Sequence, residues 1–413
     1  LGKVEVEGGT HEEKATFYSC FFRSMLFPRQ FFEYDADMKP LYYSPYDGKI
    51  HKGYMYTDTG FWDTFRAQFP LNILLQPEMH GRYVKSLVDA YEQSNWLPSW
   101  SFPGHSDGMV GNHAASLLAD AWVKGIRTFD PQKALEAMYH EATNKGPYGP
   151  SNGRDGWKEY FTIGYVPYPE YREAVAKTLA FCYDDFCAMQ VARLSGSSYY
   201  DGIFGRQIYN YKNVYDSTSR FMRGRNSKGE WTHDFDPKEW GGAYTEVSAW
   251  HYHWSVFHDI NGLINLMGGD KNFVAKLDSV FSEPNTFKVG TYRQVIHEMT
   301  EMAMINMGQY AHGNQPIQHM IYLYNYAGEP WKTQKWAREV MNKLYNSGPD
   351  GYPGDEDQVQ TSSWYVISAM GLYFVCPGKD QYVIGSPVFP NMTIHLEIVK
   401  TLTLEAIGNS LDN

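Results

Sequence analysis

Apolar residues recur at helical spacing along most of this chain, in stretches several turns long that are separated by loops rich in Gly, Pro, Asn and Asp. The pattern predicts helices over 11–26, 77–93, 113–124, 131–143, 171–196, 254–267, 291–307, 316–326 and 330–346. Polar and apolar residues alternate clearly only near the end, over 380–384 and 392–404, which predicts strands there. Paired helices joined by polar loops indicate a mostly α fold, an (α/α)6 toroid of the six-hairpin type with a few C-terminal β-strands.

No low-complexity segment or linker interrupts the helical pattern. We therefore expect one toroid over 1–378 and a β-strand segment over 379–413, which packs on the toroid or on a domain outside this sequence. The chain starts at Leu1 without a charged and then apolar leader, so we expect a fragment or a processed product.

Composition narrows the classes of function. The formal net charge of −11 comes without a basic patch, which argues against binding to nucleic acid. No run of eighteen apolar residues occurs, so no membrane span is expected. The four cysteines form no C-x-x-C pair, and Cys182 and Cys187 are expected as buried free thiols. Aromatic residues make up 16% of the chain and suit stacking on sugar rings as well as helix packing.

An acidic loop carries the most chemical information. Asp355, Glu356 and Asp357 follow a Pro-Gly turn, and three adjacent carboxylates repel one another unless a cation, water or substrate compensates. In an extended loop Asp355 and Asp357 project to the same side, where two carboxylates around one water make a general base. A solvated acidic turn is the alternative.

A second acid lies among aromatic residues. Glu246 follows Gly241 and Gly242 and is expected to open a helix that also carries Trp250 and Trp254. Desolvation there would raise the pKa of the carboxyl group and keep it protonated near neutral pH, as a general acid requires. The alternative is a glutamate that favours the helix start through the macrodipole.

His297 and Glu301 are four residues apart and share a helix face. They resemble half of the zinc peptidase pattern H-E-x-x-H, but the second histidine is missing, and Glu301 suits an oxygen-binding cation such as calcium better. Ordinary surface charges are the alternative.

Further polar residues occur where helices are expected to begin. Trp62 offers a stacking plate, Asp63 and Arg66 offer either a grip on a polar ligand or a structural pair, and His113 begins another expected helix. The loop 311–315 offers groups that bind hydroxyls or cap a helix.

Together these stretches resemble glycoside hydrolase family 92 α-mannosidases over nearly the whole chain, from about Val4 to about Leu404. The resemblance rests on eight short motifs in this order: W-D-T-F-R (62–66), Y-T-E-x-x-A-W (244–250), H-D-x-x-G-L (258–263), H-E-M-T-E (297–301), G-N-Q-P (313–316), Y-N-Y-A-G-x-P-W (324–331), P-G-D-E-D (353–357) and Y-V-I-G-S-P (382–387).

The resemblance implies a toroid preceded by an N-terminal β-sandwich that helps to form the active-site mouth, so this upstream domain is expected to be required. It implies a calcium-dependent, inverting exo-α-mannosidase that acts on mannose-containing glycans of the N-glycan or mannan type and is exported to the periplasm or cell surface or secreted. By position, Glu246 matches the general acid, and Asp355 and Asp357 match the carboxylates that activate water. His297 and Glu298 match the pair that favours α-1,2 linkages.

Three more residues, Trp62, Asp63 and His113, are expected to contact the terminal sugar, and Glu301 is expected to bind calcium. Inversion requires the acid and the base to stand roughly 6.5–9.5 Å apart. The alternatives are specificity for α-1,3, α-1,4 or phosphate-linked mannose, another toroid glycosidase, and a calcium-dependent mannose-binding protein without catalysis.

Overall fold

The computed structural model describes residues 1–397 and 399–410, and helices make up most of its regular structure. The α-helices are α1 His11–Arg23, α2 Phe61–Thr64, α3 Gln68–Leu75, α4 Pro77–Ser94, α5 Ala114–Val123, α6 Pro131–Ala142, α7 Trp157–Ile163, α8 Ala174–Ser195, α9 Ser198–Phe204, α10 Ala249–Tyr252, α11 Ile260–Leu266, α12 Asp270–Ser282, α13 His297–Ile305, α14 Pro330–Leu344 and α15 Gln360–Ala369. Short 3-10 helices are η1 Asn210–Val214, η2 Gly290–Tyr292, η3 Gln315–Ile317 and η4 Met320–Ala327.

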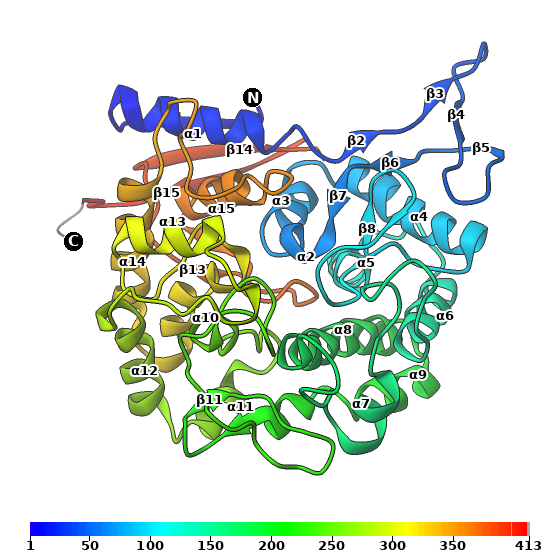
Figure 1. Ribbon diagram of the computed structural model, residues 1–413. Coiled ribbons are helices and arrows are strands. Elements are labelled where there is room, and N and C mark those ends of the chain that lie inside the picture. The colour runs from blue at the N-terminus through cyan, green and yellow to red at the C-terminus, as the bar shows by residue number, and fades with distance from the viewer. Residues whose placement is uncertain (398, 411–413) are drawn as a thin grey trace.

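The strands are short and lie mostly outside the helical body. They are β1 Val4–Glu7, β2 Arg29–Gln30, β3 Glu33–Tyr34, β4 Pro40–Tyr43, β5 Ile50–Lys52, β6 Tyr56–Thr57, β7 Thr59–Gly60, β8 Trp100–Ser101, β9 His105–Ser106, β10 Tyr215–Asp216, β11 Phe221–Met222, β12 Leu372–Tyr373, β13 Val383–Ile384, β14 Asn391–Leu396 and β15 Lys400–Glu405. The strands β3, β4 and β5 form an arm that projects from the body (Figure 1) and exposes Met38 and Ile50.

The helices follow one another around a ring in chain order (Figure 1). Contacts run from α3 to α4, from α4 to α5, from α5 to α8 and from α8 to η1. A second series runs from α11 through α12, η4 and α14 to α15. The last helix, α15, lies against both α1 and α3, so the two ends of the helical part meet.

Burial follows the sequence pattern of each helix. The helix α8 is apolar almost all round and its side chains from Ala174 to Met189 are buried, as expected of a helix enclosed by others. By contrast, α1 is amphipathic and begins with a capping box in which Thr10 and Glu13 satisfy each other's backbone N–H groups. All four cysteines are buried free thiols, which confirms the expectation for Cys182 and Cys187.

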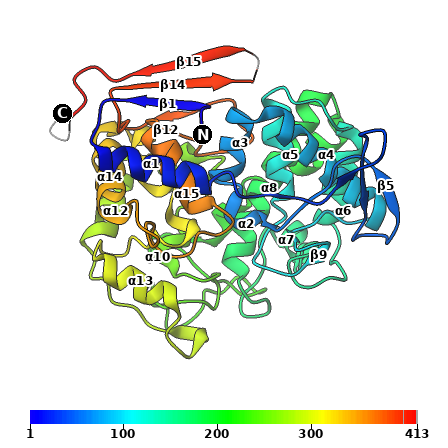
Figure 2. The ribbon, with the colours of Figure 1, turned by 90° about the horizontal axis from the view of Figure 1, so that it is seen from above.

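The C-terminal strands pair with the N-terminal one. Figure 2 shows β1, β14 and β15 side by side, and the register places Val4 opposite Ile394 and Met392 opposite Leu404. The side chains of Val4, Met392 and Ile394 are buried, and β14 contacts α3. The alternating stretch predicted over 392–404 is thus a hairpin of two strands, and position 398 between them lies outside the described residues, as do 411–413 at the end of the predicted segment 379–413.

Several predicted boundaries differ from the structure. The helix predicted over 316–326 consists of the 3-10 helices η3 and η4, and those predicted over 254–267 and 291–307 shorten to α11 and α13. The sequence pattern does not predict the helix α3, because this segment contains Pro70, which is tolerated only near the start of a helix. It does not predict the two-residue strands either, because they are too short for polar and apolar residues to alternate visibly. Among the described residues, no helix is both long and apolar enough to cross a membrane.

Candidate active site

Acidic side chains from four segments meet at one place in the ring. They are Asp63 on α2, Glu246 in the loop before α10, Glu298 on α13 and Asp357 in the loop before α15. Burial raises the pKa of Asp63, and the nearby charges of Asp357 and Glu246 add to this effect. Burial also raises the pKa of Glu246, where the nearby charges are those of Glu298 and Asp357. The structure therefore brings together residues that lie far apart in the sequence.

Glu246 is held by its backbone and by one amide side chain. Its N–H donates to the Tyr292 hydroxyl at 2.8 Å, and Asn314 Nδ2 donates to the Glu246 carbonyl oxygen at 3.3 Å and to its Oε2 at 3.5 Å. Burial, followed by the charges of Glu298 and Asp357, raises the pKa of Glu246 to about 8. The carboxyl group is thus protonated at neutral pH.

The local conformation of Glu246 differs from the prediction. Glu246 has a φ of 57° and does not open a helix, because α10 begins three residues later with Ser248 as its N-cap. A non-glycine residue in the left-handed region carries strain that the surrounding structure must compensate. The macrodipole alternative for this glutamate therefore does not apply.

Asp355 and Asp357 lie in different surroundings. The loop is not extended, since Asp357, Gln358 and Val359 all have positive φ angles, so the prediction that the two side chains project together from an extended loop is wrong. The Asp355 side chain is 67% exposed, whereas Asp357 is partly buried and accepts a hydrogen bond from Gln315 Nε2. Burial raises the pKa of Asp357 to about 7, although the Gln315 hydrogen bond lowers it.

Two consecutive residues hold the two key carboxyl groups. Asn314 bonds to Glu246, and Gln315 bonds to Asp357. Both amides are buried at the start of η3, where Asn314 is the N-cap and Gln315 is the first residue. One dipeptide thus holds both the partly buried acid and the partly buried base.

His297 lies between three carboxylates. Its Nδ1 is 2.9 Å from Glu301 Oε1, and its Nε2 is 3.2 Å from Glu298 Oε1 and 3.8 Å from Asp355 Oδ2. Partial burial opposes the charge, but the Glu301 hydrogen bond and the carboxylates of Glu298, Glu301 and Asp355 raise the pKa of His297. The shared helix face of His297 and Glu301 is confirmed, and the imidazolium offsets part of the negative charge.

Within the described residues, Glu356, the middle acid of the loop, forms its side-chain contacts with Ser362 and Arg23 and not with the other acids of the site. Its two carboxylate oxygens accept hydrogen bonds from the Ser362 N–H and hydroxyl, both at 2.9 Å. Arg23 on α1 donates from Nε to the Ser362 hydroxyl at 2.8 Å and lies 3.4 Å from Glu356 Oε2. The same guanidinium lies over the Tyr352 ring, so α1 braces the loop on both sides of Asp355.

Asp63 and Trp62 are buried on α2. Asp63 is 2% exposed, its Oδ2 has no hydrogen-bond partner, and burial raises its pKa well above the usual value. Trp62 Nε1 donates to the Tyr252 hydroxyl at 3.2 Å. Asp63 and Arg66 form no ion pair within 4 Å in the described part of the chain. The negative charges near Asp63 are those of Asp357 and Glu246.

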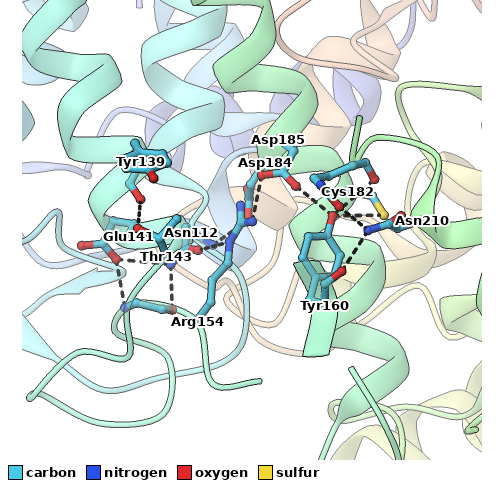
Figure 3. A network of polar contacts seen from close by, with 12 residues as sticks. Asn112, Tyr139, Glu141, Thr143, Arg154, Tyr160, Cys182, Asp184, Asp185 and Asn210 are labelled. Carbon is cyan, nitrogen blue, oxygen red and sulfur yellow. Dashed lines mark hydrogen bonds and ion pairs between the residues drawn. The ribbon is translucent and has the colours of Figure 1, made fainter. Parts of the chain in front are cut away.

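His113 is fixed by a buried polar network next to α2. Its Nδ1 lies 2.8 Å from Asp184 Oδ1, and its ring stacks on Phe65 at 4.5 Å between centroids. Figure 3 shows the neighbouring part of the network, in which Asn112 and Arg154 join Glu141 to the acids of α8. His113 thus reaches the α2 segment through Phe65, and no contact links it directly to Glu246 or Asp357 among the described residues.

Four buried oxygen atoms in the site lack hydrogen-bond partners: Asp63 Oδ2, Glu298 Oε2, Glu301 Oε2 and Asn314 Oδ1. Glu301 Oε2 lies beside Gly313, where the Cβ of any other residue would stand 3.1 Å from it. Carboxylate and amide oxygens are the donors that calcium prefers. Within residues 1–397 and 399–410, however, no three His, Cys, Asp or Glu side chains converge closely enough to hold a metal ion.

Several contributors to the site carry no local signal in the sequence. Tyr292, Arg23 and Gln315 act through partners that are 46, 339 and 42 positions away. The motif G-N-Q-P marked the loop of Asn314 and Gln315 as polar, but nothing in it assigned one amide to each carboxyl group.

Known proteins were compared with the whole chain. The family model described as the glycosyl hydrolase family 92 catalytic domain matches residues 1–413. An inverting mannosidase of this family from Bacteroides thetaiotaomicron is 54% identical, with a TM-score of 0.92, over all of this chain and 56% of that chain. A family 92 α-mannosidase from the same organism is 34% identical, with a TM-score of 0.87, over all of this chain and 52% of that chain.

A curated relative, an uncharacterized secreted glycosidase from Arthroderma benhamiae, is 25% identical over 99% of this chain and 50% of its own length. The chain therefore spans about half the length of the relatives that it matches. On the family model and these similarities, the chain belongs to glycosyl hydrolase family 92.

Proposed function

We propose that this chain is the catalytic part of an inverting, calcium-dependent exo-α-mannosidase that releases terminal mannose from α-1,2-linked mannosides. The support is the pair of carboxyl groups with raised pKa values, Glu246 at about 8 and Asp357 at about 7, each held by one of two consecutive amides. Paired carboxyl groups tuned by their surroundings are typical of glycosidases.

In the proposed reaction, Glu246 donates its proton to the glycosidic oxygen as the bond from that oxygen to C1 breaks. Asp357 accepts a proton from a water molecule whose oxygen attacks C1 from the opposite face. Asp355, which is more exposed, takes part in orienting that water, and Gln315 keeps Asp357 in place. Asp63, Trp62 and His113 are proposed to contact the terminal mannose, as the family resemblance implies.

Calcium is proposed to bind at Glu301, with Glu298 and Asn314 nearby, because each of these three residues carries an unpartnered oxygen. When bound, the ion supplies positive charge that holds sugar hydroxyls. The linkage proposal rests on His297 and Glu298, which stand together with Asp355 at the more exposed side of the site. Other linkages are the alternative.

The ring of helices is proposed to be an (α/α)6 toroid, preceded in the full-length protein by a β-sandwich. Export to the periplasm or the cell surface, or secretion, is proposed by analogy with the secreted glycosidase relative. N-glycans or mannans are the proposed glycans.

The test is release of mannose from α-1,2-mannobiose by the full-length protein with EDTA and after calcium is restored. We expect turnover with calcium and little with EDTA. Turnover of 1,3- or 1,4-mannobiose alone would refute the α-1,2 linkage, and turnover that EDTA does not reduce would refute the metal.

The substitution Glu246→Gln keeps the shape of the side chain but removes the acidic proton of the carboxyl group. It should reduce turnover by about 10²–10⁴-fold. The matched control is Glu7→Gln, since Glu7 is an exposed residue of β1. Mannose binding by the wild type without hydrolysis of any mannoside would favour the alternative of a non-catalytic binding protein.

A further inference from the structure

A cavity of about 560 Å³ opens beside the loop that carries Glu246. Three tyrosines line it, Tyr168, Tyr244 and Tyr292, together with the side chains of Arg172 and Glu173. Its size is in the range of small-molecule sites, and its walls combine aromatic faces with a few polar groups. None of the expected roles of the site uses this cavity.

Tyr292 joins the cavity to the candidate acid. Its ring lines the cavity, and its hydroxyl accepts the hydrogen bond from the Glu246 N–H at 2.8 Å. Burial, together with the charges of Glu246, Glu173 and Glu298, raises the pKa of Tyr292 to about 12, so Tyr292 lies between the cavity and the acidic site. The cavity thus begins one side chain away from Glu246.

Gly241 and Gly242 make this close approach possible. Both have positive φ angles, and a Cβ at Gly241 would come within 2.4 Å of Thr291 Oγ1, while one at Gly242 would come within 2.9 Å of the Tyr168 hydroxyl. The Gly242 N–H donates to Thr291 Oγ1 at 2.8 Å. A side chain at either position would displace the wall of the cavity.

The polar groups of the cavity are left available. In the described part of the chain, neither the Arg172 guanidinium nor the Tyr168 hydroxyl has a hydrogen-bond partner, and Arg172 forms no ion pair. Glu173 has a φ of 57° and is anchored by its N–H, which donates to the Gly242 carbonyl at 2.8 Å. An unpaired donor and a fixed carboxylate next to aromatic faces match the hydroxyls and C–H faces of a neutral sugar.

We propose that this cavity is a subsite for a neutral hexose on the leaving-group side of the glycan, beyond the sugar whose bond is cut. The assignment rests on the proposed mannosidase function. A general acid stands next to the glycosidic oxygen, which departs with the leaving sugar, so a cavity next to Glu246 lies toward the leaving group. The carboxyl group of Glu173 in its wall disfavours an anionic ligand.

The experiment compares kcat/KM for α-1,2-mannobiose and for linear α-1,2-mannotetraose in the full-length protein with calcium. The wild type should prefer the longer substrate, and Tyr168→Ala and Arg172→Ala should each reduce that preference about tenfold, mainly through a higher KM for the tetraose. Tyr168→Phe keeps the ring and should retain most of the preference.

The matched control is Arg206→Ala, because Arg206 after α9 is also an exposed arginine without an ion pair in the described residues. It should leave the ratio of the two kcat/KM values unchanged. A wild type without preference for the tetraose, or variants with the wild-type ratio, would overturn the subsite and leave the mannosidase proposal intact. Failure to hydrolyse either substrate would overturn both.

Discussion

At the scale of residues, Glu246 and Asp357 must hold opposite protonation states for the proposed reaction. Glu246 acts as its protonated form, which is lost as pH rises through about 8, and Asp357 acts as its ionised form, which is lost as pH falls through about 7. The window in which both forms coexist is therefore narrow. Because the two groups influence each other, the limbs of a pH profile belong to the pair.

Removal of the Gln315 hydrogen bond tests the pH range in which Glu246 is protonated and Asp357 is ionised. Because this hydrogen bond lowers the pKa of Asp357, Gln315→Leu should raise that pKa. The acidic limb of the pH profile of kcat/KM should move upward by roughly one pH unit, and the maximum should fall. The profile is measured at constant calcium and ionic strength.

Gln294→Leu is the control, since Gln294 is an exposed residue before α13. It should leave both limbs in place. An unchanged acidic limb in Gln315→Leu would show that Asp357 is not the base.

The sequence indicates these acids as candidates, but it does not indicate their environment. Three adjacent acids after a Pro-Gly turn and a glutamate among aromatic residues are local signals. The left-handed conformations of Glu246 and Asp357 and the amides of Asn314 and Gln315 depend on contacts between distant segments.

At the scale of elements, α1 supports the catalytic loop from outside the site. Arg23, in the last turn of α1, bonds Ser362 at the start of α15 and lies near Glu356, which is flanked by the two candidate catalytic aspartates. A brace of this kind fixes Asp355 and Asp357 without contacting the substrate, so Arg23 is a positioning residue. Misplacement of a catalytic group by about 1 Å can cost about 10²-fold in rate.

Arg23→Ala should therefore reduce kcat for α-1,2-mannobiose about tenfold or more and change KM little. Arg23→Lys keeps the charge but loses the planar donor group, so its kcat should lie between those of the wild type and Arg23→Ala. Lys14→Ala, on the same helix, serves as the control, because the Lys14 side chain forms no hydrogen bond or ion pair within the described residues. Wild-type kcat in a folded Arg23→Ala variant would contradict the positioning role.

Local elements were the more predictable ones. The face shared by His297 and Glu301 follows from helical spacing, and the start of α4 at Pro77 and of α14 at Pro330 follows from a proline in the first turn. The 3-10 helices η3 and η4 could not be separated from an α-helix by the spacing of apolar residues, since tertiary packing decides between them.

At the scale of the whole molecule, the ring closes through the two ends of the chain. The strand β1 pairs with β14, and α1 contacts α15. The pairing could not be predicted because β1 is only four residues long and its partner lies at the other end of the sequence. This closure gives the chain its own buried core, which includes Val4, Phe17 and Ile394.

The last prediction separates folding from activity. Residues 1–413 alone should unfold cooperatively, because the ring and its core are closed within the chain. Their kcat/KM for α-1,2-mannobiose should nevertheless be at least about 10²-fold below that of the full-length protein. The reason is the open mouth of the site, where the Asp355 and His297 side chains are 67% and 57% exposed, so water competes for the groups that should face the glycan. Thermal unfolding followed by circular dichroism establishes folding, and mannose release measured in parallel with calcium establishes activity. A folded chain with the activity of the full-length protein would show that the described residues form the complete site, and the proposed upstream domain would then have no part in catalysis.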